Sequence, residues 1–204
     1  MPSLGILGGT FNPPHVAHLV CARAALEQLG LDRVALVPVA APPHKPLPDD
    51  PGPEVRLELC RRAAAGEERL EVSDIEVRRG GPSYTVATLE EIHARRPEDE
   101  LTFIAGGDMA ASLPEWREPE RVLELARFAV AEREGAEREE IERRTAGLAD
   151  RERIVFFDMP RLDVSSSEVR ARVAAGRPID ELVSPAVAAY IYERGLYRTA
   201  VTAR

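Results

Sequence analysis

The fold is decided by the segment Leu4-Gly5-Ile6-Leu7-Gly8-Gly9-Thr10-Phe11-Asn12-Pro13-Pro14-His15-Val16-Ala17-His18. The apolar run at its start is ended by two glycines, a pattern that predicts a buried strand followed by a turn. Apolar residues then recur at helical spacing from His15 to Gly30, so a helix is expected there. Asn12 is a good N-cap and Pro13 a good first helical residue, which predicts that the helix begins just before His15.

The rest of the chain alternates strands and helices. Apolar, often β-branched runs predict strands at 34–39, 70–77, 101–105, 127–131 and 154–157, and helical spacing predicts helices at 54–65, 85–95, 137–149, 166–175 and 184–193. Residues 40–53 carry six prolines and are expected to form a loop. Such alternation predicts an α/β fold, a doubly wound parallel sheet with helices on both faces. We expect one domain, residues 1–204, with the helices from about 166 onward packing on it.

Composition excludes several classes of protein. The 204 residues carry a net charge of −8, which argues against binding nucleic acid or an anionic membrane through the whole surface. No run of about 18 apolar residues is present to span a membrane, and the start lacks the pattern of a secretory signal. The two cysteines, Cys21 and Cys60, lie in predicted helices and are expected to be buried thiols of a reducing compartment, the cytoplasm.

The predicted strand–turn–helix is suited to binding phosphate. Gly8 and Gly9 lack Cβ atoms and let a phosphate approach the main chain, while the helix start offers N–H groups to an anion. His15 and His18 are three residues apart and share a helix face, where imidazoles can stabilise charge on a phosphoryl group. The pair could instead bind a metal, but no third ligand is evident nearby. A nicotinamide-dependent dehydrogenase is disfavoured because the G-x-G-x-x-G fingerprint is absent.

The segment GGTFNPPHVAH resembles the GG-x-F-x-P-x-H-x-G-H signature of nucleotidyltransferases related to class I aminoacyl-tRNA synthetases. Asn12 stands where many bacterial members carry Asp, and Ala17 replaces a glycine. The resemblance implies a Rossmann-like nucleotidyltransferase fold with catalytic roles for His15 and His18. It also implies an ATP-binding set at this end of the chain, namely Gly8, Gly9, Thr10, Phe11 and His18.

A second candidate phosphate site is Ser165-Ser166-Ser167-Glu168-Val169-Arg170, at the start of a predicted helix. By itself the run could be an ordinary Ser-x-x-Glu capping box followed by a surface arginine. It is also similar to the S-[ST]-[ST]-x-[IL]-R element of the same family. That resemblance implies that Ser166, Ser167 and Arg170 bind the ATP phosphates opposite the two histidines.

Further segments are expected to select the acceptor. The chain has a single lysine, Lys45, in a Pro-Pro-His-Lys run similar to the PHK element of nicotinate mononucleotide adenylyltransferases, which implies an ammonium that closes on phosphates. Other segments similar to that subfamily imply that Tyr84 and Thr85 at a helix start bind a pyridine carboxylate and that Trp116 stacks on the ring. They also imply that Gly106 and Asp108 contact ATP. Tyr84 and Thr85 could instead be only a helix cap, and Trp116 could be a core residue.

The expected reaction is adenylyl transfer from ATP to nicotinic acid mononucleotide, with Mg²⁺ held by the substrate phosphates rather than by a protein metal site. The alternatives are a related adenylyltransferase acting on phosphopantetheine or nicotinamide mononucleotide, and a nucleotide-binding regulator without turnover. A homo-oligomer is left open.

Overall fold

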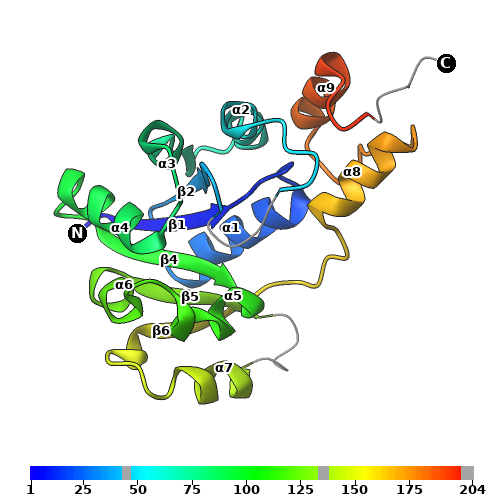
Figure 1. Cartoon of the computed structure of the whole chain (residues 1–204). Helices are drawn as coiled ribbons and strands as arrows, with labels where there is room; N and C mark the ends of the chain where they lie inside the picture. The colour runs from blue at the N-terminus through cyan, green and yellow to red at the C-terminus, as the bar shows by residue number, and fades with distance from the viewer. Residues whose placement is uncertain (43–46, 133–137, 199–204) are drawn as a thin grey trace.

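A computed structural model of the chain describes residues 1–42, 47–132 and 138–198. Within these residues the centre of the molecule is a six-stranded, all-parallel sheet in the order β3-β2-β1-β4-β5-β6 (Figure 1). The strands are β1 Ser3–Gly9, β2 Arg33–Pro38, β3 Leu70–Val72, β4 Glu100–Gly106, β5 Arg127–Glu132 and β6 Ile154–Asp158. The predicted fold class is therefore confirmed.

The order of the strands places a switch point between β1 and β4. The chain builds outward from β1 to β2 and β3, then returns to β4 on the other side of β1. Leu7 pairs with Leu36 of β2 and with Ile104 of β4, so the glycines that end β1 lie level with the carboxyl ends of both neighbours. Ligands of open parallel sheets bind at this kind of edge.

Helices cover both faces of the sheet (Figure 1). The helices are α1 Val16–Gln28, α2 Pro53–Ala63, α3 Ile75–Arg79, α4 Thr85–Arg95, α5 Gly107–Ala111, α6 Pro119–Leu125, α7 Arg138–Thr145, α8 Ser166–Ala174 and α9 Pro185–Arg194, with short 3-10 turns at Leu113–Glu115 and Arg151–Arg153. Helices α1, α2, α8 and α9 bury their apolar residues in a first core cluster on one face. Helices α3 to α7 contribute to a second core cluster on the other face.

The alternation of side chains along the strands explains the two clusters. Leu4 and Ile6 of β1 enter the second core cluster, whereas Leu7 enters the first, as expected when successive side chains point to opposite faces. Gly5, between them, has no room for a side chain, because a Cβ there would lie 2.8 Å from atoms of Leu31 and Val34.

Two predicted elements need correction, and two short helices were missed. The strand expected over 70–77 ends at Val72, because Asp74 becomes the N-cap of α3 and Ile75 is buried in the second core cluster. The helix expected over 137–149 is the shorter α7, whose described part ends at Thr145. Helices α5 and α6 were not expected at all, since each is only one or two turns long.

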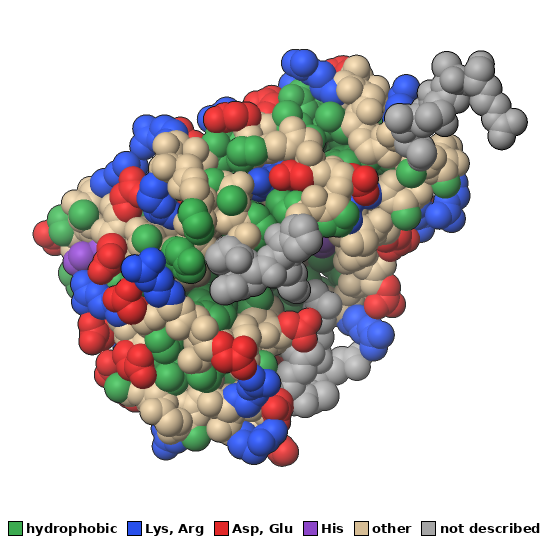
Figure 2. Space-filling view, viewed as in Figure 1, with side chains coloured by type: hydrophobic (Ala, Val, Ile, Leu, Met, Phe, Trp, Pro, Cys, Tyr) green, Lys and Arg blue, Asp and Glu red, His purple; other side chains and the backbone are tan. Residues whose placement is uncertain are grey.

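The surface agrees with the mixed charge of the sequence. Acidic and basic side chains are interspersed over the face drawn in Figure 2, without a continuous basic patch. No helix formed by the described residues is both long and apolar enough to cross a membrane. Cys21 and Cys60 are buried thiols, as predicted.

Candidate active site

Residues 10–15, which we call the opening loop, join β1 to α1 at the switch point. The turn is tight: Phe11 has a positive φ of 48°, and the Asn12–Pro13 peptide bond is cis. A Cβ on Gly9 would lie 3.1 Å from the ring of Phe11, so a side chain at position 9 would require that ring to shift by a few tenths of an ångström. Phe11 was expected to bind ATP; its side chain is fully buried, so its contact with a nucleotide stays a prediction for its main chain.

The start of α1 differs from the sequence prediction. His15 is the N-cap and Val16 the first helical residue, so neither Asn12 nor Pro13 has the position expected for it. The reason is that the Asn12 side chain is 2% exposed and is engaged elsewhere, donating through Nδ2 to the carbonyl of Pro48 at 3.0 Å. The helix consequently starts at Val16, one residue after the start of its apolar pattern at His15 and three residues after the first helical position suggested by Pro13.

The two histidines lie against each other, with ring centroids 3.8 Å apart. The main-chain N–H of His15 donates to Nδ1 of His18 at 3.1 Å, so this nitrogen carries no proton. In the neutral imidazole the proton then resides on Nε2, which makes that atom a hydrogen-bond donor. The edge contact between His18 and Phe11, at 4.9 Å, further orients the ring.

Helix α8 brings the second predicted cluster to the opening loop. Ser166 Oγ donates to the carbonyl of Pro13 at 2.8 Å, and Arg170 Nη1 donates to the carbonyl of Asn12 at 2.8 Å. Arg170 Nη2 also contacts Ser167 Oγ at 3.3 Å. Two segments about 150 residues apart are thus joined directly, as the sequence predicted.

The capping function and the site coexist in α8. Ser165 is the N-cap, and its Oγ accepts from the N–H of Glu168 at 3.1 Å. The N–H groups of Ser166 and Ser167 belong to the first turn, where an α-helix offers them no internal partner. Ser165 therefore makes the N-cap bond of a Ser-x-x-Glu capping box, while the Glu168 carboxylate pairs with Arg172. This cap leaves the helix start suited to an anion.

Arg56 is an organising residue of the site that the sequence analysis missed. It is fully buried in α2, and Nη1 donates to the carbonyls of Thr10 and Val39 at 3.0 and 2.6 Å. Nη2 donates to the carbonyl of Ala40 at 3.0 Å, and Nε pairs with Asp50 at 2.9 Å. The residue links the ends of β1 and β2, yet in the sequence it is one of 26 arginines with nothing to mark it.

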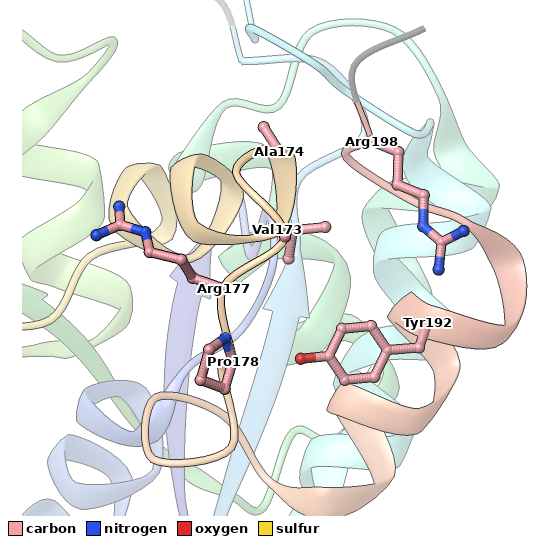
Figure 3. A pocket seen from close by; sticks show the side chains of 7 residues that line it. Val173, Ala174, Arg177, Pro178, Tyr192 and Arg198 are labelled. Carbon is pink, nitrogen blue, oxygen red and sulfur yellow. The ribbon is translucent and has the colours of Figure 1, made fainter. Parts of the chain in front are cut away.

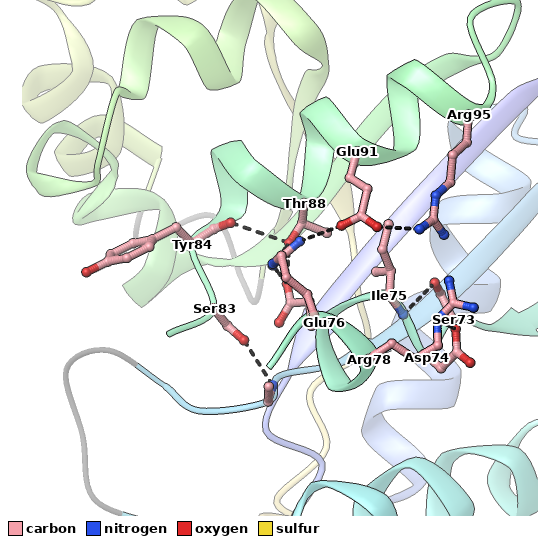
Figure 4. A network of polar contacts seen from close by, with 12 residues as sticks. Ser73, Asp74, Ile75, Glu76, Arg78, Ser83, Tyr84, Thr88, Glu91 and Arg95 are labelled. Atoms are coloured by element: carbon pink, nitrogen blue, oxygen red, sulfur yellow. Dashed lines mark hydrogen bonds and ion pairs between the residues drawn. The ribbon is translucent and has the colours of Figure 1, made fainter. Parts of the chain in front are cut away.

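The predicted acceptor segment begins α4. Tyr84 is the N-cap and Thr85 the first helical residue, so both stand at a helix start, as predicted. Behind them lies a buried polar group shown in Figure 4: Thr88 Oγ1 donates to Glu76 at 2.6 Å, and Ser83 Oγ accepts from the N–H of Ala40 at 2.9 Å. Burial raises the pKa of the Glu76 carboxyl above its usual value, although hydrogen bonds from Ser83 and Thr88 act in the opposite direction.

Trp116 has a larger packing role than the sequence suggested. Its indole is half-buried, makes edge contacts with Phe103 and Phe128 at 5.8 and 5.7 Å, and donates from Nε1 to Ser112 at 3.0 Å. The neighbouring Arg117 lies 5.0 Å from the centre of the Tyr84 ring, which places the two predicted acceptor segments side by side. Packing against the core, the alternative to ring stacking, therefore explains the contacts on one side of the indole.

The remaining predicted residues are placed as follows. Gly106 ends β4 and caps α5, and the exposed Asp108 lies in the first turn of that helix, at the carboxyl edge of the sheet. Lys45 lies outside the described residues.

A cavity of about 580 Å³ opens elsewhere, between the end of α8 and α9 (Figure 3). Arg177, Tyr192 and Arg198 are among the residues that line it, and it contains no residue of the predicted site.

Fold and site together define a nucleotidyltransferase: the chain belongs to the cytidylyltransferase-like family, whose model matches residues 6–172. The names of its relatives give a more specific activity than the family model does. A protein of Roseiflexus sp. named "Probable nicotinate-nucleotide adenylyltransferase" is 45% identical over 195 residues, covering 96% of this chain and 98% of its own. One of the same name from Trichlorobacter lovleyi is 41% identical over 210 residues, with 96% and 99% covered. Among solved structures, nicotinic acid mononucleotide adenylyltransferase of Plasmodium falciparum complexed with NaAD shares the fold, with a TM-score of 0.77, 19% identity, and 97% and 98% covered.

Proposed function

We propose that the protein is a nicotinate-nucleotide adenylyltransferase, which joins ATP and nicotinic acid mononucleotide into nicotinic acid adenine dinucleotide and releases pyrophosphate in NAD biosynthesis. The observation that carries the proposal is the contact of Ser166 and Arg170 with the carbonyls of Pro13 and Asn12. It joins the histidine-bearing loop and the start of α8 into one phosphate-binding edge. The names of relatives that match nearly the whole chain supply the acceptor.

The chemistry needs positioning more than a strong base. A phosphate oxygen of the mononucleotide attacks the α-phosphorus of ATP in line, and the bond to the bridging oxygen of pyrophosphate breaks. The acceptor is already a nucleophile, so no covalent enzyme intermediate is required. His18 donates from Nε2 to an oxygen of the reacting phosphate, and the first-turn N–H groups of α8 bind the departing phosphates.

The residues around the opening loop fit a magnesium ion that is held by the phosphates of ATP and not by protein side chains. Imidazole and guanidinium groups surround the loop, and in the described part of the chain His, Cys, Asp and Glu side chains form no group of three that could hold the ion alone. We therefore propose that substrate phosphates provide its ligands, where it would neutralise charge on them. Lys45 is proposed to add an ammonium that binds the substrate phosphates, and the two buried thiols support action in the reducing cytoplasm.

The acceptor is proposed to lie between the start of α4 and Trp116. The N–H groups at Thr85 suit a carboxylate better than a neutral amide, because a helix start attracts negative charge. The exposed side of the Trp116 indole can stack on a pyridine ring. Together these features favour the nicotinate form of the mononucleotide over the nicotinamide form.

An acceptor panel tests the proposal. The protein is incubated with ATP and magnesium chloride and, in turn, nicotinic acid mononucleotide, nicotinamide mononucleotide and phosphopantetheine, with pyrophosphate and the product mass recorded. We expect pyrophosphate and the dinucleotide with nicotinic acid mononucleotide, and much slower release with its amide. Preference for phosphopantetheine would move the chain to another adenylyltransferase, and ATP binding without pyrophosphate from any acceptor would indicate a regulator.

A further inference from the structure

Asn12 in the opening loop is held by three segments that are distant in sequence. Its side chain donates from Nδ2 to the carbonyl of Pro48, and its Oδ1 accepts from the hydroxyl of Tyr197 at 2.9 Å. Its main-chain carbonyl accepts from Arg170. The residue is 2% exposed, so each of these bonds is shielded from water.

The direction of the bond to Tyr197 follows from the partners. A carbonyl such as that of Pro48 only accepts, so the amide nitrogen of Asn12 must face it, and the amide oxygen must face Tyr197. Tyr197 is consequently the donor. Burial raises the pKa of its hydroxyl above the usual value, so the proton stays in place over the working pH range.

The end of the chain fixes Tyr197 in this position. Helix α9 ends at Arg194 with Gly195 as a left-handed cap, and the N–H of Leu196 bonds to the carbonyl of Ile191 at 3.0 Å. Tyr197 itself has a φ of 60°, an uncommon conformation for a residue with a side chain, and its ring packs on the first core cluster. The chain after α9 thus turns back toward the opening loop, where the hydroxyl of Tyr197 contacts Asn12.

We propose that Tyr197 is a positioning residue for adenylyl transfer: its hydroxyl holds Asn12, and through it the loop that presents His15 and His18 to the ATP phosphates. The inference rests on the proposed function and adds the C-terminal segment to the site. A catalytic histidine displaced by a fraction of an ångström loses transition-state contacts while the acceptor pocket is unaffected. The effect should therefore appear in kcat and not in the KM for the acceptor.

The test compares Tyr197→Phe with the wild-type protein. This variant removes one oxygen atom and keeps the ring, and Tyr192→Phe, an exposed tyrosine of α9, is the matched control. We expect Tyr197→Phe to lower kcat on the order of tenfold, as for one buried hydrogen bond, with the KM for nicotinic acid mononucleotide within about twofold. If Tyr197→Phe had the same kcat as Tyr192→Phe, the proposal would be overturned. It would also be overturned if Tyr197→Phe lost kcat/KM only through a higher KM, with kcat unchanged.

Combination with changes at Asn12 identifies the partner of the hydroxyl. In an Asn12→Ala background, Tyr197→Phe should have almost no further effect on kcat, whereas in Asn12→Asp, which keeps an acceptor, it should still have one. An undiminished effect in Asn12→Ala would show that the hydroxyl acts elsewhere. If Asn12→Ala does not fold, the Asn12→Asp background still tests the proposal. A Tyr197→Phe substitution that had no effect on kcat in that background would contradict it.

Hydrogen exchange separates this proposal from the proposed function. Measured without substrates, the peptide that contains residues 10–15 should exchange faster in Tyr197→Phe than in the wild-type protein or in Tyr192→Phe. Unchanged exchange would refute the positioning role even if kcat fell. A wild-type protein that exchanges as expected but transfers no adenylyl group would refute the proposed function and leave the contact intact.

Discussion

Arg170 Nη1 lies 2.8 Å from the main-chain carbonyl oxygen of Asn12. This bond connects the start of the penultimate helix with the loop after the first strand, and Ser166 adds a second bond to the next carbonyl, that of Pro13. The guanidinium thus shapes the loop at the same time as it supplies charge, because its planar group carries several donors in fixed directions. Its side chain is only 12% exposed, which limits the conformations open to it.

Lysine at position 170 should not be able to perform the function of Arg170. Arg170→Lys keeps the charge but cannot reach both the Asn12 carbonyl and Ser167 with the geometry of the fork. We expect kcat/KM for ATP to fall on the order of tenfold or more, as measured by pyrophosphate release. Arg172→Lys, an arginine of the same helix that pairs with Glu168, is the control. Equal kinetics for the two variants would remove Arg170 from the site.

His18 should prove essential for turnover but not for folding. His18→Ala should lower kcat by a factor on the order of hundreds, the cost of losing one transition-state donor. Because His18 Nδ1 also accepts the N–H of His15, His18→Gln is a useful companion, as glutamine at this helix position can keep that bond. Both variants should lose turnover, with the thermal midpoint better kept in the glutamine variant. Turnover near that of the exposed control His93→Ala would refute the assignment.

Arg56 should dominate the stability of the loops. Arg56→Met fills the space but leaves the carbonyls of Thr10, Val39 and Ala40 without their donor. Loss of one partner from a buried network costs about 3 kcal/mol or more of unfolding free energy. Denaturant titration should show that loss, while Arg61→Ala, which changes an exposed arginine of the same helix, should cost less than about 0.5 kcal/mol. Similar values for both would mean that the network adds little.

Glu76 should make stability fall with rising pH. Its pKa is raised in the folded protein above the value of 4.5, mainly by burial, so the folded state binds a proton more tightly than the unfolded state (Figure 4). The contribution of this group is therefore fully present below pH 4.5 and is lost as the pH rises through the folded pKa. Unfolding curves at several pH values should show that Glu76→Gln gains relative to the wild-type protein as the pH increases. The exposed Glu90→Gln should follow the wild-type slope, and a Glu76→Gln variant that did so too would contradict the pKa shift.

Local patterns predicted most of the fold. The apolar runs of β1, β2, β4, β5 and β6 and the helical spacing of α1, α2, α4, α8 and α9 were visible because each element is long enough to show its own period. The edge strand β3, of three residues, and the helices α3, α5 and α6, of five to seven residues, were misassigned or missed. A strand of three residues hardly alternates, and a helix of five to seven residues makes no more than about two turns of 3.6 residues. Asn12 shows the other limit, since its cap propensity was overridden by two tertiary partners.

By itself, the sequence determined the parallel sheet, the glycine turn at its edge and the chemical types gathered near it, because these depend on residues close together along the chain. The tertiary structure alone decided that Arg56 is buried beneath two loops, that Trp116 packs on the core and that Tyr197 reaches Asn12. Those contacts join residues between 12 and 185 positions apart. Such contacts have no period or spacing in the sequence, since a buried donor selects whichever carbonyl the folded chain brings within reach.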